Sequence, residues 1–191
     1  MKYLAHISLF RYLMIVILST AIIACNTTKT TTKSPHQKKV YYYAGEGPNA
    51  EFYAKYSKKL GVKFKGTEDK KLIEAIAGWI GTPYVYGGCT KSGTDCSGFI
   101  KTLYKDVYNI DLNRSAYDLY NDVVEVKKKD LKFGDVVFFK ISGTKISHVG
   151  LYLADNKFVH AASSKGVMVS DLTEAYYTKY YYCSGRIKKL H

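Results

Sequence analysis

The hydrophobic pattern of the chain changes its period once, near residue 115. Before this point apolar side chains recur at helical spacing, so each set would share one face of a helix. After it, runs of β-branched and aromatic residues indicate strands. These runs span residues 136–139, 146–153, 157–161, 167–169 and 182–187. Helices followed by strands predict an α+β domain whose N-terminal helices pack on a central antiparallel β-sheet.

Capping residues predict where the helices begin and end. Asn49 and Gly61 would bound a first short helix. Thr67 would cap the next one, with two acidic residues in its first turn, where the helix dipole favours negative charge. Asp95 and Ser115 would cap two further helices. The Gly-rich segment that precedes Asp95 is expected to be a loop.

Residues 1–24 have the features of a secretory signal peptide. Lys2 and Arg11 precede an apolar run whose unbroken part is too short to cross a membrane. The run ends in Ile-Ile-Ala-Cys at 22–25, which resembles a bacterial lipobox. This resemblance implies cleavage before Cys25 and attachment of lipid to its thiol. The alternative is an ordinary signal peptide followed by a chance cysteine.

The segment 25–40 is predicted to be a lipidated flexible tether, because 26–39 contain no aliphatic or aromatic side chain for a core. Residues 41–66 would form a short helical lead-in, and 67–191 the folded domain. The formal net charge of +13 would suit nucleic acid, but six of these charges lie in the signal and tether. An exported lipoprotein does not meet nucleic acid. The remaining positive charge would favour an anionic envelope, or it reflects a lysine-rich face that is simply exposed to solvent.

Cys96 is the candidate nucleophile. It would lie in the first turn of the helix capped by Asp95, where backbone N–H groups and the helix dipole lower the pKa of a thiol. A thiolate at this position attacks a carbonyl group if a base can reach it. The alternative is a small buried core residue, which is a common fate of a free cysteine.

His148 and His160 flank a turn predicted at Asp155-Asn156, and the strand register decides whether they meet. A two-residue loop leaves the histidines on opposite faces of the sheet. A three-residue loop pairs Gly150 with His160 and makes the histidines diagonal neighbours on one face. In that register His148 would act as base and His160 would orient it. Spacing alone does not select between the two registers.

Five stretches of the chain follow one another in a recognisable order. They are GTPYVYGG at 81–88, TDCSGF at 94–99, LKFGDVVFF at 131–139, SHVGLY at 147–152 and FVHA at 158–161. Together they resemble the NlpC family of papain-like cysteine peptidases, which cut the stem peptides of peptidoglycan. The resemblance covers roughly residues 67–191 and implies a papain-like NlpC-type domain.

Carried over residue by residue, the resemblance implies four catalytic roles. Cys96 becomes the nucleophile, and His148 the general base and then the acid. His160 becomes the polar residue that orients the His148 ring. Tyr84 matches the family tyrosine whose hydroxyl binds the tetrahedral oxyanion, together with the Cys96 N–H.

Three further residues are assigned to substrate binding. Asp95 and Ser97 are first of all the cap and start of a helix, and in some relatives these positions also contact the substrate's amine. Arg114 matches a family arginine beside the cleft. A groove arginine would suit the carboxylates of the stem peptide through bidentate hydrogen bonds, and a surface ion pair is the alternative.

The resulting prediction is a monomeric lipoprotein of the bacterial envelope that faces the peptidoglycan, on the periplasmic side in a Gram-negative cell. It would hydrolyse the γ-D-Glu–diaminopimelate or the diaminopimelate–D-Ala bond of stem peptides, with no cofactor and no metal. The alternatives are a catalytically idle peptidoglycan-binding lipoprotein, acyl transfer by the same chemistry, and a zinc site made from Cys96, His148 and His160. Cys89 and Cys183 depart from the family pattern, and either a disulfide or two free thiols fits the sequence.

Overall fold

The fold was obtained as a computed structural model that describes residues 47–190. The predicted signal peptide, the tether and Cys25 lie outside the described residues. Six antiparallel strands form one sheet in the order β3-β8-β4-β5-β6-β7. These strands are β3 (Val123–Val126), β4 (Val136–Phe139), β5 (His148–Ala154), β6 (Lys157–Ala162), β7 (Gly166–Asp171) and β8 (Tyr181–Ile187).

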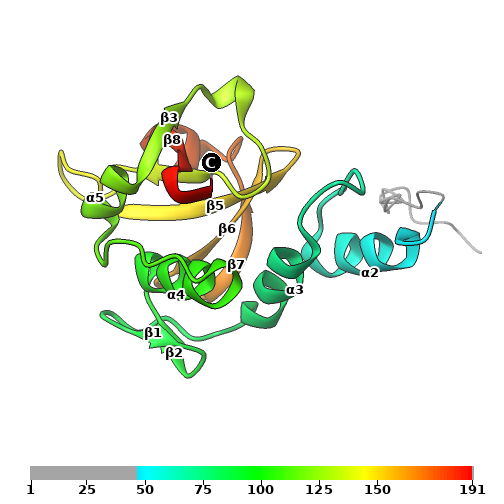
Figure 1. The fold of residues 1–191 in the computed structure, drawn as a ribbon. Helices are drawn as coiled ribbons and strands as arrows, with labels where there is room; N and C mark the ends of the chain where they lie inside the picture. Colours follow the sequence, from blue (N-terminus) through cyan, green and yellow to red (C-terminus); the bar gives the residue numbers. More distant parts are fainter. Residues whose placement is uncertain (1–46, 191) are drawn as a thin grey trace, which may run out of the picture. The chain divides into compact units, whose positions relative to one another are not determined.

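Helices precede most of the strands in the chain, which confirms the predicted α+β class (Figure 1). They are α2 (Ala50–Leu60), α3 (Lys70–Trp79), α4 (Cys96–Tyr108), α5 (Ala116–Leu119) and α6 (Ala175–Tyr180), with short 3-10 helices at Tyr120–Asp122, Lys128–Asp130 and Lys188–Leu190. Figure 1 shows α4 along one face of the sheet, with α3 beside it. Within residues 47–190, every helix is too short or too polar to cross a bilayer.

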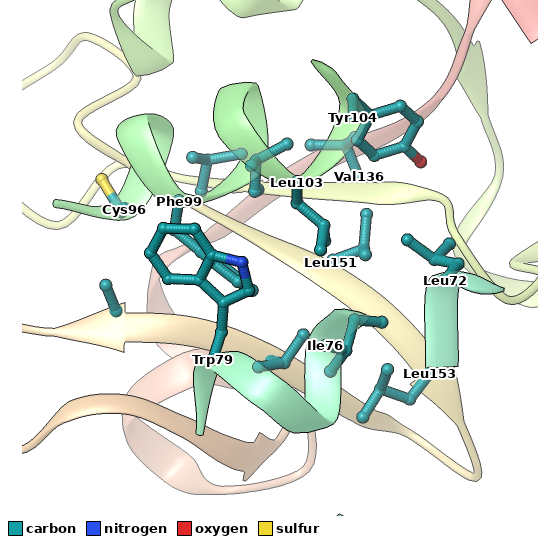
Figure 2. Close-up of a cluster of buried hydrophobic side chains, with 14 of the residues drawn as sticks. Leu72, Ile76, Trp79, Cys96, Phe99, Leu103, Tyr104, Val136, Leu151 and Leu153 are labelled. Atoms are coloured by element: carbon teal, nitrogen blue, oxygen red, sulfur yellow. The ribbon is translucent and has the colours of Figure 1, made fainter. Parts of the chain in front are cut away.

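The sheet buries apolar side chains on both of its faces. On the side of α4, Phe99 and Leu103 pack in one core with Leu151 and Leu153 of β5 (Figure 2). Val149 of β5 belongs to the same core. The three β5 residues share this face, as their alternation predicted. The opposite face carries a smaller core that α6 completes, made of Val137, Phe139, Phe158, Leu172 and Tyr177.

The helix boundaries agree with the capping signals except at α3. Asp95 caps α4, because its carboxylate accepts the Gly98 N–H at 2.7 Å, and Ser115 caps α5 in the same way. The prediction that Thr67 caps α3 is wrong. Asp69 is the cap and accepts the N–H groups of residues 71 and 72, since its carboxylate binds the free amides of a first turn more strongly than a hydroxyl does.

The lead-in contributes to the same core as the rest of the domain. Helix α2 begins after Asn49 and ends at Gly61, whose φ of 66° is the left-handed conformation that glycine adopts without strain. Asn49 makes no side-chain cap. Its amide oxygen instead accepts a hydrogen bond from Lys70 Nζ at 3.1 Å. Tyr53 and Phe64 are buried in the main core, so the lead-in packs on α3 and on the ring of Phe133.

The pattern did not predict β1 (Cys89–Thr90), β2 (Gly93–Thr94), β3 and α6. The Gly-rich loop contains the short ladder of β1 and β2, which is too short to show a period. Strand β3 lies at the edge of the sheet, with only four residues and a mixed sequence. Helix α6 is rich in tyrosine, a residue typical of strands, and its helical form depends on packing over the smaller core.

Gly150 of β5 lies under the ring of Phe158. A Cβ atom at Gly150 would lie 2.5 Å from Cδ2 of Phe158 and 3.1 Å from the carbonyl oxygen of Val159. We predict that Gly150→Ala lowers the free energy of unfolding by about 1–3 kcal/mol in urea denaturation, because a fully buried ring must move. As a control, Gly78→Ala in α3 meets only Lys91 Nζ at 3.4 Å and should be neutral or stabilising. Equal stability of the two variants would contradict this packing.

Candidate active site

Cys96 is the first residue of α4 and lies at the margin of the main core (Figure 2). The side chain is 8% exposed. The backbone N–H of Val149 hydrogen-bonds to the Cys96 sulfur. Because Val149 follows His148 in β5, this contact brings the thiol to the strand end that carries His148.

The helix N-terminus does not make Cys96 a resting thiolate, and this expectation is corrected by the structure. Burial raises the pKa of the Cys96 thiol, and the neighbouring Asp95 carboxylate raises it further. The N–H groups of Val149, Ser97 and Cys96 itself act in the opposite direction. The effects of burial and Asp95 together exceed theirs, so the thiol is neutral at rest.

The turn between β5 and β6 is the two-residue type. Asp155 and Asn156 have φ values of 49° and 62°, and Ala154 pairs with Lys157 across them. Two positive φ angles define the tight hairpin turn that Asn and Asp tolerate best after glycine. On its own, this turn would place the two histidines on opposite faces.

A bulge just before the turn changes that outcome. It shifts the register so that Leu151 pairs with Val159. Continuing the shifted register by one residue places Gly150 opposite His160, and His148 then lies on the same face. The structure therefore combines the tight turn of one predicted alternative with the strand pairing of the other. An extra residue in a strand leaves no clear mark on the hydrophobic pattern, so the sequence did not reveal it.

His148 and His160 are in direct contact as a result. Nε2 of His148 lies 2.9 Å from Nδ1 of His160, and the two rings are almost perpendicular. Burial lowers the pKa of His148 to about 4. Burial and the adjacent His148 lower the pKa of His160 to about 3. Both imidazoles are therefore neutral at neutral pH.

Two hydroxyl groups contact the far side of His160. Its Nε2 lies 3.1 Å from Oγ of Ser170 in β7 and 3.1 Å from Oη of Tyr177 in α6. Sequence reasoning missed both residues. Tyr177 lies on a helix that the pattern did not predict, and Ser170 lies beyond the end of the strand predicted at 167–169.

Tyr84 lies near the thiol, in the loop before α4. An isolated parallel bridge pairs it with Thr94, and the Val85 N–H donates to the Thr94 carbonyl at 3.0 Å. Burial raises the pKa of the Tyr84 phenol, and the nearby Cys96 and Asp95 raise it further. The phenol is therefore a protonated donor close to Cys96 at neutral pH.

Asp95 and Arg114 form a bidentate ion pair beside the nucleophile. The two guanidinium nitrogens lie 2.9 and 2.7 Å from the two carboxylate oxygens. Burial alone would raise the pKa of Asp95, but Arg114 and the N–H groups of Gly98 and Gly87 lower it. Ser97 joins this group, because its Oγ accepts from Arg114 at 3.1 Å. The bidentate bonds that we expected Arg114 to offer a substrate are made to Asp95, so its carboxylate-binding role stays a prediction.

The three cysteines within the described residues are free. Cys89 is exposed on β1 and Cys183 is buried on β8, so the structure has no disulfide between them. Across residues 47–190 no group of three His, Cys, Asp or Glu side chains is arranged to hold a metal ion. For the zinc alternative, the facing nitrogens of His148 and His160 bind each other.

Comparison with known proteins identifies the family. The sequence pattern of the NlpC/P60 family matches residues 81–186, which is more than half of the chain. The chain belongs to the NlpC/P60 family. The matched range contains the contact between Cys96 and Val149 and the contact between His148 and His160.

Two curated relatives illustrate the similarity. A probable endopeptidase NlpC homolog from Haemophilus influenzae is 41% identical over 119 residues, which is 62% of this chain and 63% of the relative. The Escherichia coli K12 protein named murein DD-endopeptidase MepS/murein LD-carboxypeptidase is 38% identical over 111 residues, or 58% of each chain. The chain thus matches less than two thirds of either relative.

Solved structures support the NlpC/P60 fold. An NlpC/P60 family protein from Bacillus cereus has a TM-score of 0.56 at 30% identity. The match covers 61% of this chain and 39% of the Bacillus cereus chain. A Staphylococcus aureus protein described as similar to lipoprotein, NLP/P60 family, has a TM-score of 0.57 at 28% identity. The match covers 72% of this chain and 48% of the Staphylococcus aureus chain. The predicted papain-like NlpC-type fold is therefore confirmed.

The Asp95–Arg114 pair gives a prediction about stability. Arg114→Ala should lower the free energy of unfolding by about 2 kcal/mol, because it leaves a largely buried carboxylate without two charge-assisted hydrogen bonds. Arg114→Lys keeps the charge and should lose less. Urea denaturation measures both, with Lys129→Ala in an exposed 3-10 helix as the control. Native stability of Arg114→Ala would show that the pair is dispensable.

Proposed function

We propose that this protein is a cysteine endopeptidase that hydrolyses amide bonds in the peptides of peptidoglycan. The observation that carries the proposal is a pair of contacts at one end of β5. There the Val149 N–H bonds to the Cys96 sulfur, and His148 contacts His160 at 2.9 Å. Acyl transfer requires a nucleophile, a base near it and a group that orients the base. The names of the relatives support endopeptidase activity, and one of them supports murein as substrate.

The neutral resting state determines the order of proton transfers. His148 takes the proton of the Cys96 thiol as the sulfur attacks the amide carbonyl. A C–S bond forms, and the carbonyl oxygen becomes an oxyanion. His148 then protonates the leaving amine, the C–N bond breaks, and a thioester remains on Cys96. Water then attacks the thioester carbonyl while His148 accepts a proton from it, and a C–O bond forms. The C–S bond breaks, the carboxylic acid leaves, and His148 returns its proton to the sulfur to restore the thiol.

Tyr84 and the backbone N–H of Cys96 are proposed to bind the oxyanion. The raised pKa of the Tyr84 phenol keeps its proton in place at neutral pH, so it can donate to the developing charge. Donors fixed in a largely buried site stabilise such a charge more strongly than water does. Asp95 and Arg114 hold the start of α4, and through it the Cys96 N–H, in position.

The site predicts a loss of activity that is specific to one cysteine. Cys96→Ala should abolish release of stem-peptide fragments from purified peptidoglycan, measured by mass spectrometry. Cys89→Ala is the matched control, because Cys89 is an exposed free thiol, and it should keep its activity. The fragment masses also tell the γ-D-Glu–diaminopimelate bond from the diaminopimelate–D-Ala bond.

Two results would contradict the endopeptidase proposal. Fragment release by Cys96→Ala would exclude cysteine catalysis at this position. Binding of the wild-type protein to peptidoglycan with no cleavage would instead support the catalytically idle wall-binding alternative.

The lowered pKa of His148 predicts the pH dependence of catalysis. His148 must be neutral to accept the thiol proton, and with a pKa of about 4 it stays neutral down to mildly acidic pH. We therefore expect kcat/KM to hold between about pH 7 and 5.5 and to fall at lower pH, since this ratio reports the free enzyme. An acidic limb centred near the ordinary histidine value of about 6.5 would contradict a buried, neutral base.

We further propose that the chain is a lipoprotein of the bacterial cell envelope. The basic and apolar leader and the lipobox-like sequence that ends at Cys25 support this, and a substrate in the cell wall requires export. The lipid on Cys25 would hold the domain near its polymer through the tether at 26–39. The domain would act as a monomer.

Lipid attachment is testable on the full chain. Cells that express the wild-type protein with labelled palmitate should incorporate label into it, and Cys25→Ala should lose the label and remain uncleaved at the lipobox. Cys89→Ala should keep the label. Equal labelling of wild type and Cys25→Ala would exclude a lipid anchor at this residue.

A further inference from the structure

We infer that Ser170 and Tyr177 are positioning residues that fix which nitrogens of the His148–His160 pair carry protons. This inference rests on the proposed function, because it concerns how His148 becomes a base. Nδ1 of His160 faces His148 at 2.9 Å, and Nε2 faces both hydroxyl oxygens at 3.1 Å. The four side chains form one continuous polar chain on the face of the sheet that α6 covers.

The ring of His160 is held firmly in this orientation. Its side chain is only 1% exposed. Phe158 stacks on one face of the ring, with centroids 4.9 Å apart, and Tyr177 meets the ring edge at 5.4 Å. Ser170 and Tyr177 are themselves buried. The two hydroxyls therefore act on His160 in a site shielded from bulk water.

The location of one proton on His160 decides whether His148 can act as a base. A neutral imidazole has one donor nitrogen and one acceptor nitrogen. If His160 is protonated on Nε2, its Nδ1 accepts the Nε2–H of His148, and the lone pair of His148 lies on Nδ1. If His160 is protonated on Nδ1, it donates to Nε2 of His148, whose own proton then occupies Nδ1 and blocks proton uptake there.

The proposed function requires the first arrangement, and the hydroxyl pair offers oxygens that can accept the proton on Nε2. In this arrangement the Nε2–H of His160 donates to Ser170 Oγ at 3.1 Å, and Ser170 Oγ in turn donates to Tyr177 Oη at 3.4 Å. The Tyr177 oxygen lies at the same distance from Nε2, and one N–H can be shared between two acceptors. With its proton on Nε2, His160 offers Nδ1 to His148 throughout the reaction, including when His148 is an imidazolium.

The test removes the hydroxyls and keeps the packing. The variants are Tyr177→Phe, Ser170→Ala and the double variant, with Ser170→Thr as a rescue that retains a hydroxyl. Tyr181→Phe is the matched control, because Tyr181 donates to Ser184 at 2.9 Å and forms a similar hydroxyl pair in β8. Nitrogen-15 NMR of the imidazole rings reports the tautomers without substrate, and steady-state kinetics on peptidoglycan fragments reports kcat and KM.

We expect wild type, Tyr181→Phe and Ser170→Thr to show His148 and His160 protonated on Nε2. The double variant should shift His160 toward protonation on Nδ1. Its kcat should fall at least about tenfold with little change in KM, because neither hydroxyl touches substrate and only part of the acid–base contribution is lost. Each single variant keeps one acceptor oxygen and should lie between wild type and the double variant, with thermal unfolding confirming that all are folded.

Two outcomes would overturn the inference: His160 protonated on Nδ1 in the wild-type protein, or a double variant with wild-type tautomers and kcat. The NMR result separates this inference from the proposed function. If the wild-type protein cuts no peptidoglycan but its tautomers shift as expected in the double variant, the proposed function fails and the positioning role stands. If it cuts peptidoglycan and the tautomers do not change, the positioning role fails alone.

Discussion

The β-bulge in β5, one residue before the tight turn, is the feature on which the rest of the site depends. The turn alone would place His148 and His160 on opposite faces of the sheet, because side chains alternate along a strand. With the bulge, both rings lie on the face covered by α6, and Gly150 leaves room for Phe158 to stack on the His160 ring. The bulge thus changes strand pairing by one residue and brings together two side chains that are twelve positions apart in the chain.

The site lies between the two cores of the domain, and burial sets its electrostatics. Cys96 belongs to the margin of the main core, whereas His160 packs with the smaller core through Phe158 and Tyr177. Burial raises the pKa of the thiol and lowers the pKa of both imidazoles, so the site rests without charge next to the Asp95–Arg114 ion pair. The positions of individual protons in the site therefore depend more on hydrogen bonds than on net charge.

Sequence reasoning predicted the features that depend on local chemistry. The cap at Asp95, the helix start at Cys96, the turn at Asp155 and the order of helices and strands follow from short-range preferences. The features it missed depend on tertiary packing. The bulge leaves the hydrophobic pattern unchanged, α6 is helical despite its tyrosines, and the burial that raises the pKa of Cys96 comes from distant parts of the chain. The cap of α3 is Asp69 and not the predicted Thr67, because a carboxylate competes better than a hydroxyl for free amides.

The central claim is that Cys96 forms a covalent bond with the peptide that is cut. Rapid quenching of the wild-type protein with a purified muropeptide, followed by digestion and mass spectrometry, tests it directly. The account predicts a transient acyl adduct on the fragment that contains Cys96, with a mass equal to the acyl half of the cleaved peptide, appearing as the amine product is released. Product formation with no adduct at Cys96, or with an adduct on another residue, would contradict it.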